Sequence, residues 1–252
     1  MSCGPPTATI AVLTPDWPAP AAVHAAFTLR TGGVSAPPFD SLNVAVHVGD
    51  AAAAVTENRQ RICAQLRLPA QPSWMEQVHG TDVLELAGKT PHATADAVFT
   101  RRPGRVCVVQ VADCLPVLFA AGDGSAVAVA HAGWRGLAAG VLEATVARLA
   151  LQPRELIAWL GPAIGPGHFE VGPEVRAAFT AHDAGAAAAF ASNARGRWQC
   201  DLAALARRRL ATLGVTAVFG ASWCTYADRT SFFSYRRDGA CGRMAALIWL
   251  AR

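Results

Sequence analysis

The sequence predicts an α+β fold in which mixed β-sheets are flanked by helices, within one domain that spans residues 1–252. Apolar runs of strand length follow one another through the middle of the chain, and amphipathic helical segments stand between them. No linker or internal repeat divides the 252 residues, which are enough to bury a substantial core. Residues 1–22 contain five prolines and are expected to be an irregular N-terminal segment.

Each element follows from its local pattern. Apolar runs bounded by turn residues predict strands at 23–29, 73–78, 82–86, 96–99, 106–112, 115–121, 126–131, 156–160, 215–219 and 245–250. Helical spacing of apolar residues predicts helices at 51–68, 137–149, 173–181 and 201–213. Asp50 and Asp201 stand where the first and last of these helices need an N-cap. The alanine-rich segment 184–197 is compatible with a helix or a loop.

Composition argues against a membrane or nucleic-acid partner. No run of about 18 apolar residues is present, although 52% of the residues are hydrophobic. The net charge is only +4, and the one basic run, residues 207–209, is expected to form a solvated helix face. The N-terminus lacks the basic region of a secretory signal. We therefore expect a cytoplasmic protein, and the sequence leaves its oligomeric state open.

Cysteine usage does not indicate a disulfide framework. The seven cysteines are odd in number, scattered through apolar runs and never arranged as C-x-x-C. Most are expected to be ordinary buried residues, with Cys114 as the exception.

Cys114 lies at one end of a predicted β-hairpin. Apolar residues 117–121 and 126–130 flank the turn-forming segment 122–125. A turn centred at residues 123–124 pairs position 116 with 131 and position 114 with 133, so Cys114 and His131 lie side by side at the open end. Their meeting indicates a metal site or a Cys/His catalytic pair.

His79 is a third candidate ligand, because it ends a strand-like run and precedes Gly80. Two imidazoles and one thiolate, with a fourth position left to water, are typical of catalytic zinc. From spacing alone, a zinc site, a metal-free Cys114/His131 pair and simple burial all stay open. Three further candidates have no supporting local pattern: His92, His168 and Cys224.

Polar residues near two turns could bind a substrate. Gly133 and Gly136 bracket Arg135 where the hairpin runs into a predicted helix, and a guanidinium at a helix N-terminus suits phosphate or carboxylate. Tight strand-to-helix packing with a paired Arg135 is the alternative. A second polar cluster supplies three more candidates: Arg30, Asn43 and Arg59. The stretch 234–239 is similarly ambiguous.

Seven short motifs stand in order from about residue 25 to the C-terminus: RTGGVS at 30–35, SLN at 41–43, QVHG at 77–80, ADCLP at 112–116, AHAGWRG at 130–136, GPAIGP at 161–166 and FSYRRDG at 233–239. Together they resemble the laccase-domain purine nucleoside phosphorylase family, formerly labelled polyphenol oxidase and also called peptidoglycan editing factor.

The resemblance implies a zinc site whose ligands, which are also the catalytic residues, fall on His79, Cys114 and His131. It implies phosphorolysis of adenosine, inosine and methylthioadenosine, with a secondary adenosine deaminase activity. Nucleoside and phosphate are then the expected small-molecule partners. The resemblance also implies a fold like that of toxin-type cysteine hydrolases. The chain departs from the family at Gly167-His168, where members commonly carry two cysteines.

Arg30, Arg59 and Arg135 are candidates to hold the phosphate. Asp113, next to Cys114, is a candidate to orient a ligand histidine.

Two other functions remain open at this point. Cys114 and His131 could be the nucleophile and base of a cysteine hydrolase or amidase that edits peptidoglycan precursors. Alternatively, zinc could simply stabilise a non-enzymatic domain. Laccase chemistry is not expected, because seven singly scattered histidines do not suit several copper sites. Copper could still occupy the zinc site in vitro.

Overall fold

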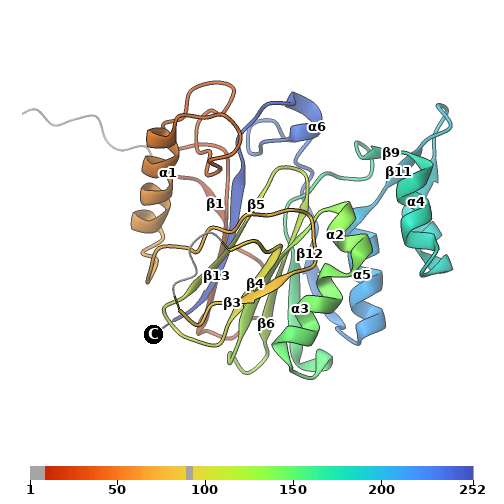
Figure 1. Ribbon diagram of the computed structural model, residues 1–252, viewed down its shortest axis with the longest axis horizontal. Helices are drawn as coiled ribbons and strands as arrows, with labels where there is room; N and C mark the ends of the chain where they lie inside the picture. The colour runs from red at the N-terminus through yellow and green to blue at the C-terminus, as the bar shows by residue number, and fades with distance from the viewer. Residues whose placement is uncertain (1–8, 89–92, 252) are drawn as a thin grey trace, which may run out of the picture.

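Two large β-sheets packed face to face form the body of the protein (Figure 1). The computed structural model describes residues 9–88 and 93–251, so Cys3 and His92 lie outside the described residues. Its mixed sheets and flanking helices confirm the predicted α+β class.

The larger sheet has six strands and is mixed. Its order is β12 (Ala217–Gly220), β8 (Leu156–Leu160), β6 (Leu115–Ala121), β7 (Val127–Ala132), β4 (Ala97–Thr100) and β3 (Val83–Glu85). The two outermost pairs are parallel and the central pairs are antiparallel.

The second sheet is antiparallel, with the order β1 (Val12–Leu13), β2 (Val23–Thr28), β13 (Met244–Leu250) and β5 (Val106–Val111). The predicted irregular segment 1–22 thus contains a short strand, β1. A small third sheet joins β10 (Phe190–Ser192), β11 (Trp198–Cys200) and β9 (Glu170–Val171).

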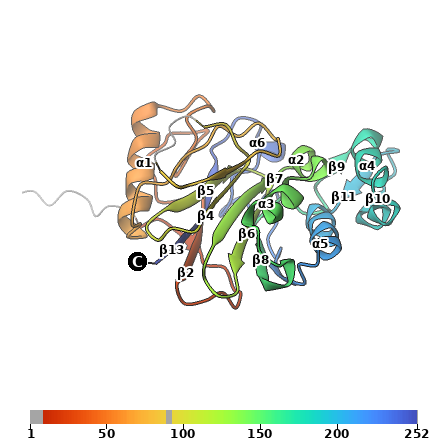
Figure 2. The ribbon, with the colours of Figure 1, turned by 60° about the horizontal axis from the view of Figure 1, so that its bottom comes forward.

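Helices surround the three sheets. They are α1 (Ala52–Gln65), α2 (Trp134–Ala139), α3 (Val141–Leu149), α4 (Pro173–Thr180), α5 (Leu202–Leu213) and α6 (Tyr235–Asp238), with the 3-10 turns η1 (Pro153–Glu155) and η2 (Ala184–Ala189). Figure 2 shows α1 on one side of the sheets and α2, α3 and α5 on the other. Among the helices of residues 9–88 and 93–251, none has both the length and the hydropathy of a membrane-spanning segment.

Alternating side chains build three hydrophobic cores between these layers. On β6, Phe119 faces the core shared with α3 and α5, whereas Leu118 faces the core between the two sheets. On β5, Val109 lies in the inter-sheet core, and Val108 packs toward Ile62 of α1. Strands buried on both faces explain why the sequence shows continuous apolar runs there.

The structure corrects three local predictions and confirms a fourth. Segment 73–78 is not a strand and forms only an isolated bridge at Glu76, because the next backbone N–H groups bind a carboxylate instead of a strand partner. The predicted 137–149 helix is two helices, because Gly140 adopts a left-handed φ of 104° between them. Asp201 caps α5 as predicted. Asp50 does not cap α1, because Ala51 is its N-cap and the Asp50 carboxylate also binds Ser35 and Asn43.

The basic run at residues 207–209 is largely structural. Arg207 donates to the carbonyls of Val218 and Gly220, and Arg209 pairs with Glu143. Only Arg208 is exposed, and it pairs with Asp183. Cys107, Cys200 and Cys241 are buried as expected, whereas Cys63 and Cys224 are half-buried.

Candidate metal centre and pocket

The β6–β7 hairpin brings Cys114 and His131 together. Pro116 pairs with His131 across the hairpin, which confirms the predicted register, and Cys114 directly precedes β6. A local turn fixes this register, since Gly124 has a φ of 76° and its N–H donates to the carbonyl of Ala121.

His79 reaches the same point from a loop. Its φ of 61° lies in the left-handed region, in which histidine is several-fold enriched among non-glycine residues. The loop is shaped by Asp96, whose carboxylate accepts the backbone N–H groups of Val78, His79 and Gly80 at 3.1, 3.0 and 2.7 Å. These bonds replace a strand partner and aim the imidazole at the hairpin.

The three side chains form one compact donor set. His79 Nε2 lies 3.8 Å from Cys114 Sγ, and one donor atom from each of His79, Cys114 and His131 lies within 4.8 Å of the others. Tetrahedral zinc with bonds of about 2.0–2.3 Å to nitrogen and sulfur has donor separations of about 3.3–3.8 Å, so a small adjustment would fit the ion. The residues therefore suit a zinc-type metal.

Asp96 also orients His131. Its Oδ1 lies 2.8 Å from His131 Nδ1, and both side chains are almost completely buried. The bond leaves His131 Nε2 for a metal, and a carboxylate behind a ligand histidine is a common feature of metal sites. The predicted orienting role of Asp113 is wrong, because the Asp113 carboxylate accepts bonds from Thr225 Oγ1 and the Arg236 N–H.

Electrostatics favour a charged thiolate in this donor set. Burial raises the pKa of the Cys114 thiol, but the neighbouring His131 and His79 outweigh it and lower the pKa to about 6. Burial lowers the pKa of His131, but the Cys114 thiolate and Asp96 raise it to about 9. The thiolate is the form that binds metal.

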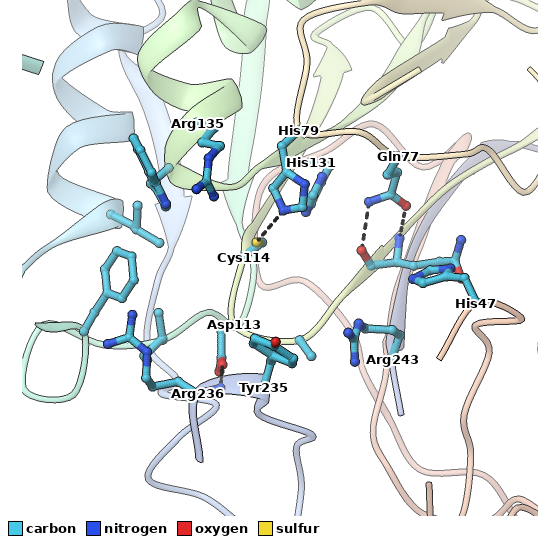
Figure 3. Close-up of a pocket in the computed structure, with 16 residues that line it drawn as sticks. His47, Gln77, His79, Asp113, Cys114, His131, Arg135, Tyr235, Arg236 and Arg243 are labelled. Carbon is cyan, nitrogen blue, oxygen red and sulfur yellow. Dashed lines mark hydrogen bonds between the residues drawn. The ribbon is translucent and has the colours of Figure 1, made fainter. Parts of the chain in front are cut away.

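The donor set stands on the wall of a cavity of about 510 Å³, a size typical of small-molecule sites (Figure 3). Three arginines line it, Arg135, Arg236 and Arg243, together with His47, Gln77, Gln110, Trp134, Phe169 and Tyr235. The Arg135 guanidinium lies 4.5 Å from the ring centre of Trp134, which directly precedes it. The cavity is therefore cationic and partly aromatic.

Of the four predicted substrate-binding residues, only Arg135 lines this cavity. The other three have structural partners. Arg30 donates to the carbonyls of Asp40 and Arg229. Buried Asn43 donates to Ala45 and Asp50. Arg59 donates to the carbonyl of Val44 and stacks on Trp74 at 4.1 Å, and burial lowers its pKa to about 10.

Sequence reasoning missed several residues of the site. Asp96 begins a predicted apolar strand, and a lone carboxylate there was a signal that could have found it. Arg236 lies in the stretch 234–239, whose pattern is ambiguous. Gln77 stands in the QVHG motif, whereas His47, Gln110 and Arg243 have no local signal. His168 and Cys224 form a separate contact, with Nδ1 3.6 Å from Sγ, outside the metal donor set.

Together, the fold and the site define an α+β protein in which three candidate metal ligands line a cavity of the size that binds small molecules. Residues 24–251 match the family described as multi-copper polyphenol oxidoreductase laccase, and the chain belongs to that family.

Several proteins are similar over nearly their whole length. Purine nucleoside phosphorylase YfiH of Escherichia coli is 54% identical over 241 residues, which cover 95% of this chain and 98% of that protein. Purine nucleoside phosphorylase PA4543 of Pseudomonas aeruginosa is 55% identical, over 94% of this chain and 98% of that protein. The crystal structure of Neisseria meningitidis protein NMB0706 has a TM-score of 0.91 and 48% identity, and covers 96% of this chain and 99% of that one. These matches confirm the family resemblance seen in the motifs.

The word multi-copper in the family description does not fit the donor groups present. Within the part of the chain that the structure describes, His79, Cys114 and His131 form the one group of three or more potential ligands. Several copper sites would need several such groups. The likeness to toxin-type cysteine hydrolases stays a prediction, since none of these matches bears on it.

Proposed function

We propose that the chain is a zinc-dependent cytoplasmic purine nucleoside phosphorylase acting on adenosine, inosine and methylthioadenosine, with a secondary adenosine deaminase activity. The observation that carries the proposal is the His79, Cys114 and His131 donor set at the wall of a cationic cavity. The names of the E. coli and P. aeruginosa relatives support the reaction class.

Phosphorolysis exchanges one bond for another at the sugar. A phosphate oxygen bonds to C1′ of the ribose while the bond from C1′ to the purine nitrogen breaks. The purine leaves with the electron pair and takes up a proton, and ribose 1-phosphate is the second product. The site must therefore bind an anion, pack a flat base and stabilise departing charge.

The residues divide these tasks. Arg135, one of three cavity arginines, is positioned to bind phosphate through a planar set of donors. Trp134 and Phe169 offer apolar surface to the base. Zinc held by His79, Cys114 and His131 would supply a Lewis acid at the cavity wall. Asp96 keeps the Nδ1 proton of His131 in place and so holds its other nitrogen toward the cavity.

The test is incubation of the purified protein with adenosine, with and without phosphate. Adenine and ribose 1-phosphate formed only with phosphate would support phosphorolysis, and inosine formed without phosphate would reveal deamination. Cys114→Ala should lose zinc and turnover while remaining folded. Full activity of a metal-free Cys114→Ala preparation would contradict the zinc-dependent mechanism, and metal analysis would show whether copper replaces zinc.

A cysteine hydrolase or amidase acting on peptidoglycan precursors is the second candidate. The lowered pKa of Cys114 beside His131 favours it, since the pair resembles a nucleophile and its base. Iodoacetamide labelling distinguishes the zinc-dependent phosphorylase from the cysteine hydrolase. A zinc-bound Cys114 should be protected until a chelator is added, after which labelling should accelerate as pH rises through about 6 and the thiol ionises. Immediate labelling without chelator would favour the hydrolase.

A further inference from the structure

Gln110 carries a buried amide oxygen, Oε1, that has no hydrogen-bond partner among the described residues. It lies near the end of β5, it is 8% exposed, and its side chain lines the cavity. A buried amide left unpaired is costly, and such a group beside a cavity points to a ligand.

The neighbouring amide of Gln77 shows the contrast. Gln77 Oε1 accepts the Gln110 backbone N–H at 2.7 Å, and Gln77 Nε2 donates to the Gln110 carbonyl at 2.9 Å (Figure 3). Both ends of Gln77 are therefore occupied, and they hold the main chain of Gln110 in place. Only the Gln110 side chain remains available, and its broad terminal torsion allows either end of the amide to face a ligand.

The cavity has two unlike sides. In Figure 3, Arg135 and Arg236 lie on one side of Cys114, whereas Gln77, His47 and Arg243 lie on the other. Two aromatic rings belong to the first side, because Arg135 lies over Trp134 and Arg236 lies 5.2 Å from the ring centre of Phe169, whereas the ring centre of Tyr235 lies 5.7 Å from Arg243 of the second side. The hydrogen bonds to Gln77 place Gln110 on the second, more polar side.

We propose that Gln110 determines sugar specificity by hydrogen-bonding a ribose hydroxyl of the nucleoside. The inference rests on the proposed function. A flat purine packed against Trp134 and Phe169 leaves the sugar toward Gln110, across the candidate metal ligands. A hydroxyl both donates and accepts, as an amide does, so it can pair with either end of the Gln110 side chain.

The experiment compares inosine with 2′-deoxyinosine and 3′-deoxyinosine, using the zinc-loaded full chain and phosphate. The wild type should prefer inosine to one of the two deoxy analogues by about 10–100-fold in kcat/KM, because that analogue leaves the buried amide unpaired. Gln110→Met should lower kcat/KM for inosine by about 10–100-fold and for that analogue by less than about 3-fold. The ratio of kcat/KM for inosine to kcat/KM for that analogue should then fall toward one.

Gln199→Met is the matched control. The Gln199 Oε1 is also buried and unpaired within the described residues, but Gln199 lies on β11 and does not line the cavity. Its removal should leave the sugar preference unchanged. Gln110→Glu keeps an acceptor oxygen and the side-chain length, so it should retain part of the preference for inosine over the deoxy analogue. This variant replaces Gln110→Met in the test if Gln110→Met unfolds at a much lower temperature than the wild type.

Three results would overturn the inference. The wild type could turn over inosine and both deoxy analogues equally, or Gln110→Met could slow all three sugars equally. Gln110→Met could instead lose discrimination against purine riboside, which lacks the 6-substituent. That result would mean that Gln110 recognises the base rather than the sugar. If the wild type cleaves no nucleoside with phosphate, the proposed function itself fails, which is a distinct outcome.

Discussion

Asp96 joins chain segments that the sequence keeps far apart. Its carboxylate accepts three backbone N–H groups around His79 and also binds His131, which lies 35 residues away. Burial raises the pKa of Asp96, but the bonds from His131 and from the N–H groups outweigh it, so the net pKa is lowered. Asp96 therefore stays ionised and positions two of the three candidate metal ligands.

Asp96→Asn should weaken zinc binding by about 10–100-fold, the usual effect of losing a carboxylate behind a ligand histidine. An amide keeps only one acceptor oxygen, so it can hold only part of the His79 loop, and it no longer supplies the negative charge that holds His131. Competition with a chromogenic chelator measures the affinity. Asp123→Asn, at the exposed turn of the same hairpin, is the control and should bind zinc normally. Equal affinities in both variants would contradict a positioning role for Asp96.

Arg135→Ala should raise the KM for phosphate, because Arg135 is the predicted anion ligand that lines the cavity. Steady-state rates at varied phosphate measure the effect. Arg59→Ala is a sharp comparison, since Arg59 bonds Val44 and stacks on Trp74 outside the cavity. It should lower the free energy of unfolding by about 1–2 kcal/mol and leave the KM unchanged. An unchanged phosphate dependence in Arg135→Ala would remove Arg135 from this role.

The β6–β7 hairpin shows which elements a sequence can predict. Its turn, its register and the approach of Cys114 to His131 follow from a local Gly/Asp/Ser cluster between two apolar runs. Segment 73–78 has an equally strand-like pattern but is not a strand. The conformation at the end of this segment depends on a hydrogen bond from the Val78 N–H to the Asp96 carboxylate. Asp96 is distant in sequence, so no local pattern predicts this bond.

Gly133, the residue between β7 and α2, allows two candidate metal ligands to approach the backbone. Its φ of −61° suits any residue, so the constraint is steric. A Cβ there would lie 2.8 Å from His79 Cδ2 and 2.9 Å from Cys114 Sγ. The ligands, rather than the helix, would have to move.

Gly133→Ala should therefore impair zinc binding more than folding. We expect zinc affinity to fall by about tenfold or more while the metal-free protein melts within a few degrees of wild type, because misplaced ligands bind poorly. Isothermal titration and thermal melts measure the two effects. Gly167→Ala is the control, since nothing lies within 4 Å of a Cβ at that position. A Gly133→Ala protein with normal zinc affinity would show that the ligands adjust freely.

On the scale of the whole molecule, the sequence predicts the class of fold but not the order of its layers. Continuous apolar runs identify most strands because the central strands are buried on both faces. The pairing of β13 with both β2 and β5, which brings the C-terminus into the middle of the second sheet, depends on contacts across more than 130 residues. For the same reason His47 and Arg243 reach the cavity without any local signal.

Three hydrophobic cores hold this layered fold together, and none of them requires a metal. The candidate ligands stand at one loop and at one end of one hairpin. Removing zinc should therefore leave a folded protein that unfolds cooperatively. Metal bound at 100–1,000 times its Kd contributes about 3–4 kcal/mol, and a chain of this size shifts in Tm by about 2–4 °C per kcal/mol. Chelation should accordingly lower the Tm by about 6–16 °C.

Calorimetry with and without chelator measures this shift, and Cys114→Ala provides the control. That variant should melt near the chelated wild type and should not respond to chelator, because one of the three ligands is missing. Loss of any cooperative transition after chelation, with no turnover of nucleosides by the zinc-loaded protein, would instead support a non-enzymatic domain stabilised by zinc. A folded metal-free chain that regains nucleoside cleavage when zinc is restored would place the ion in the chemistry rather than in the stability of the fold.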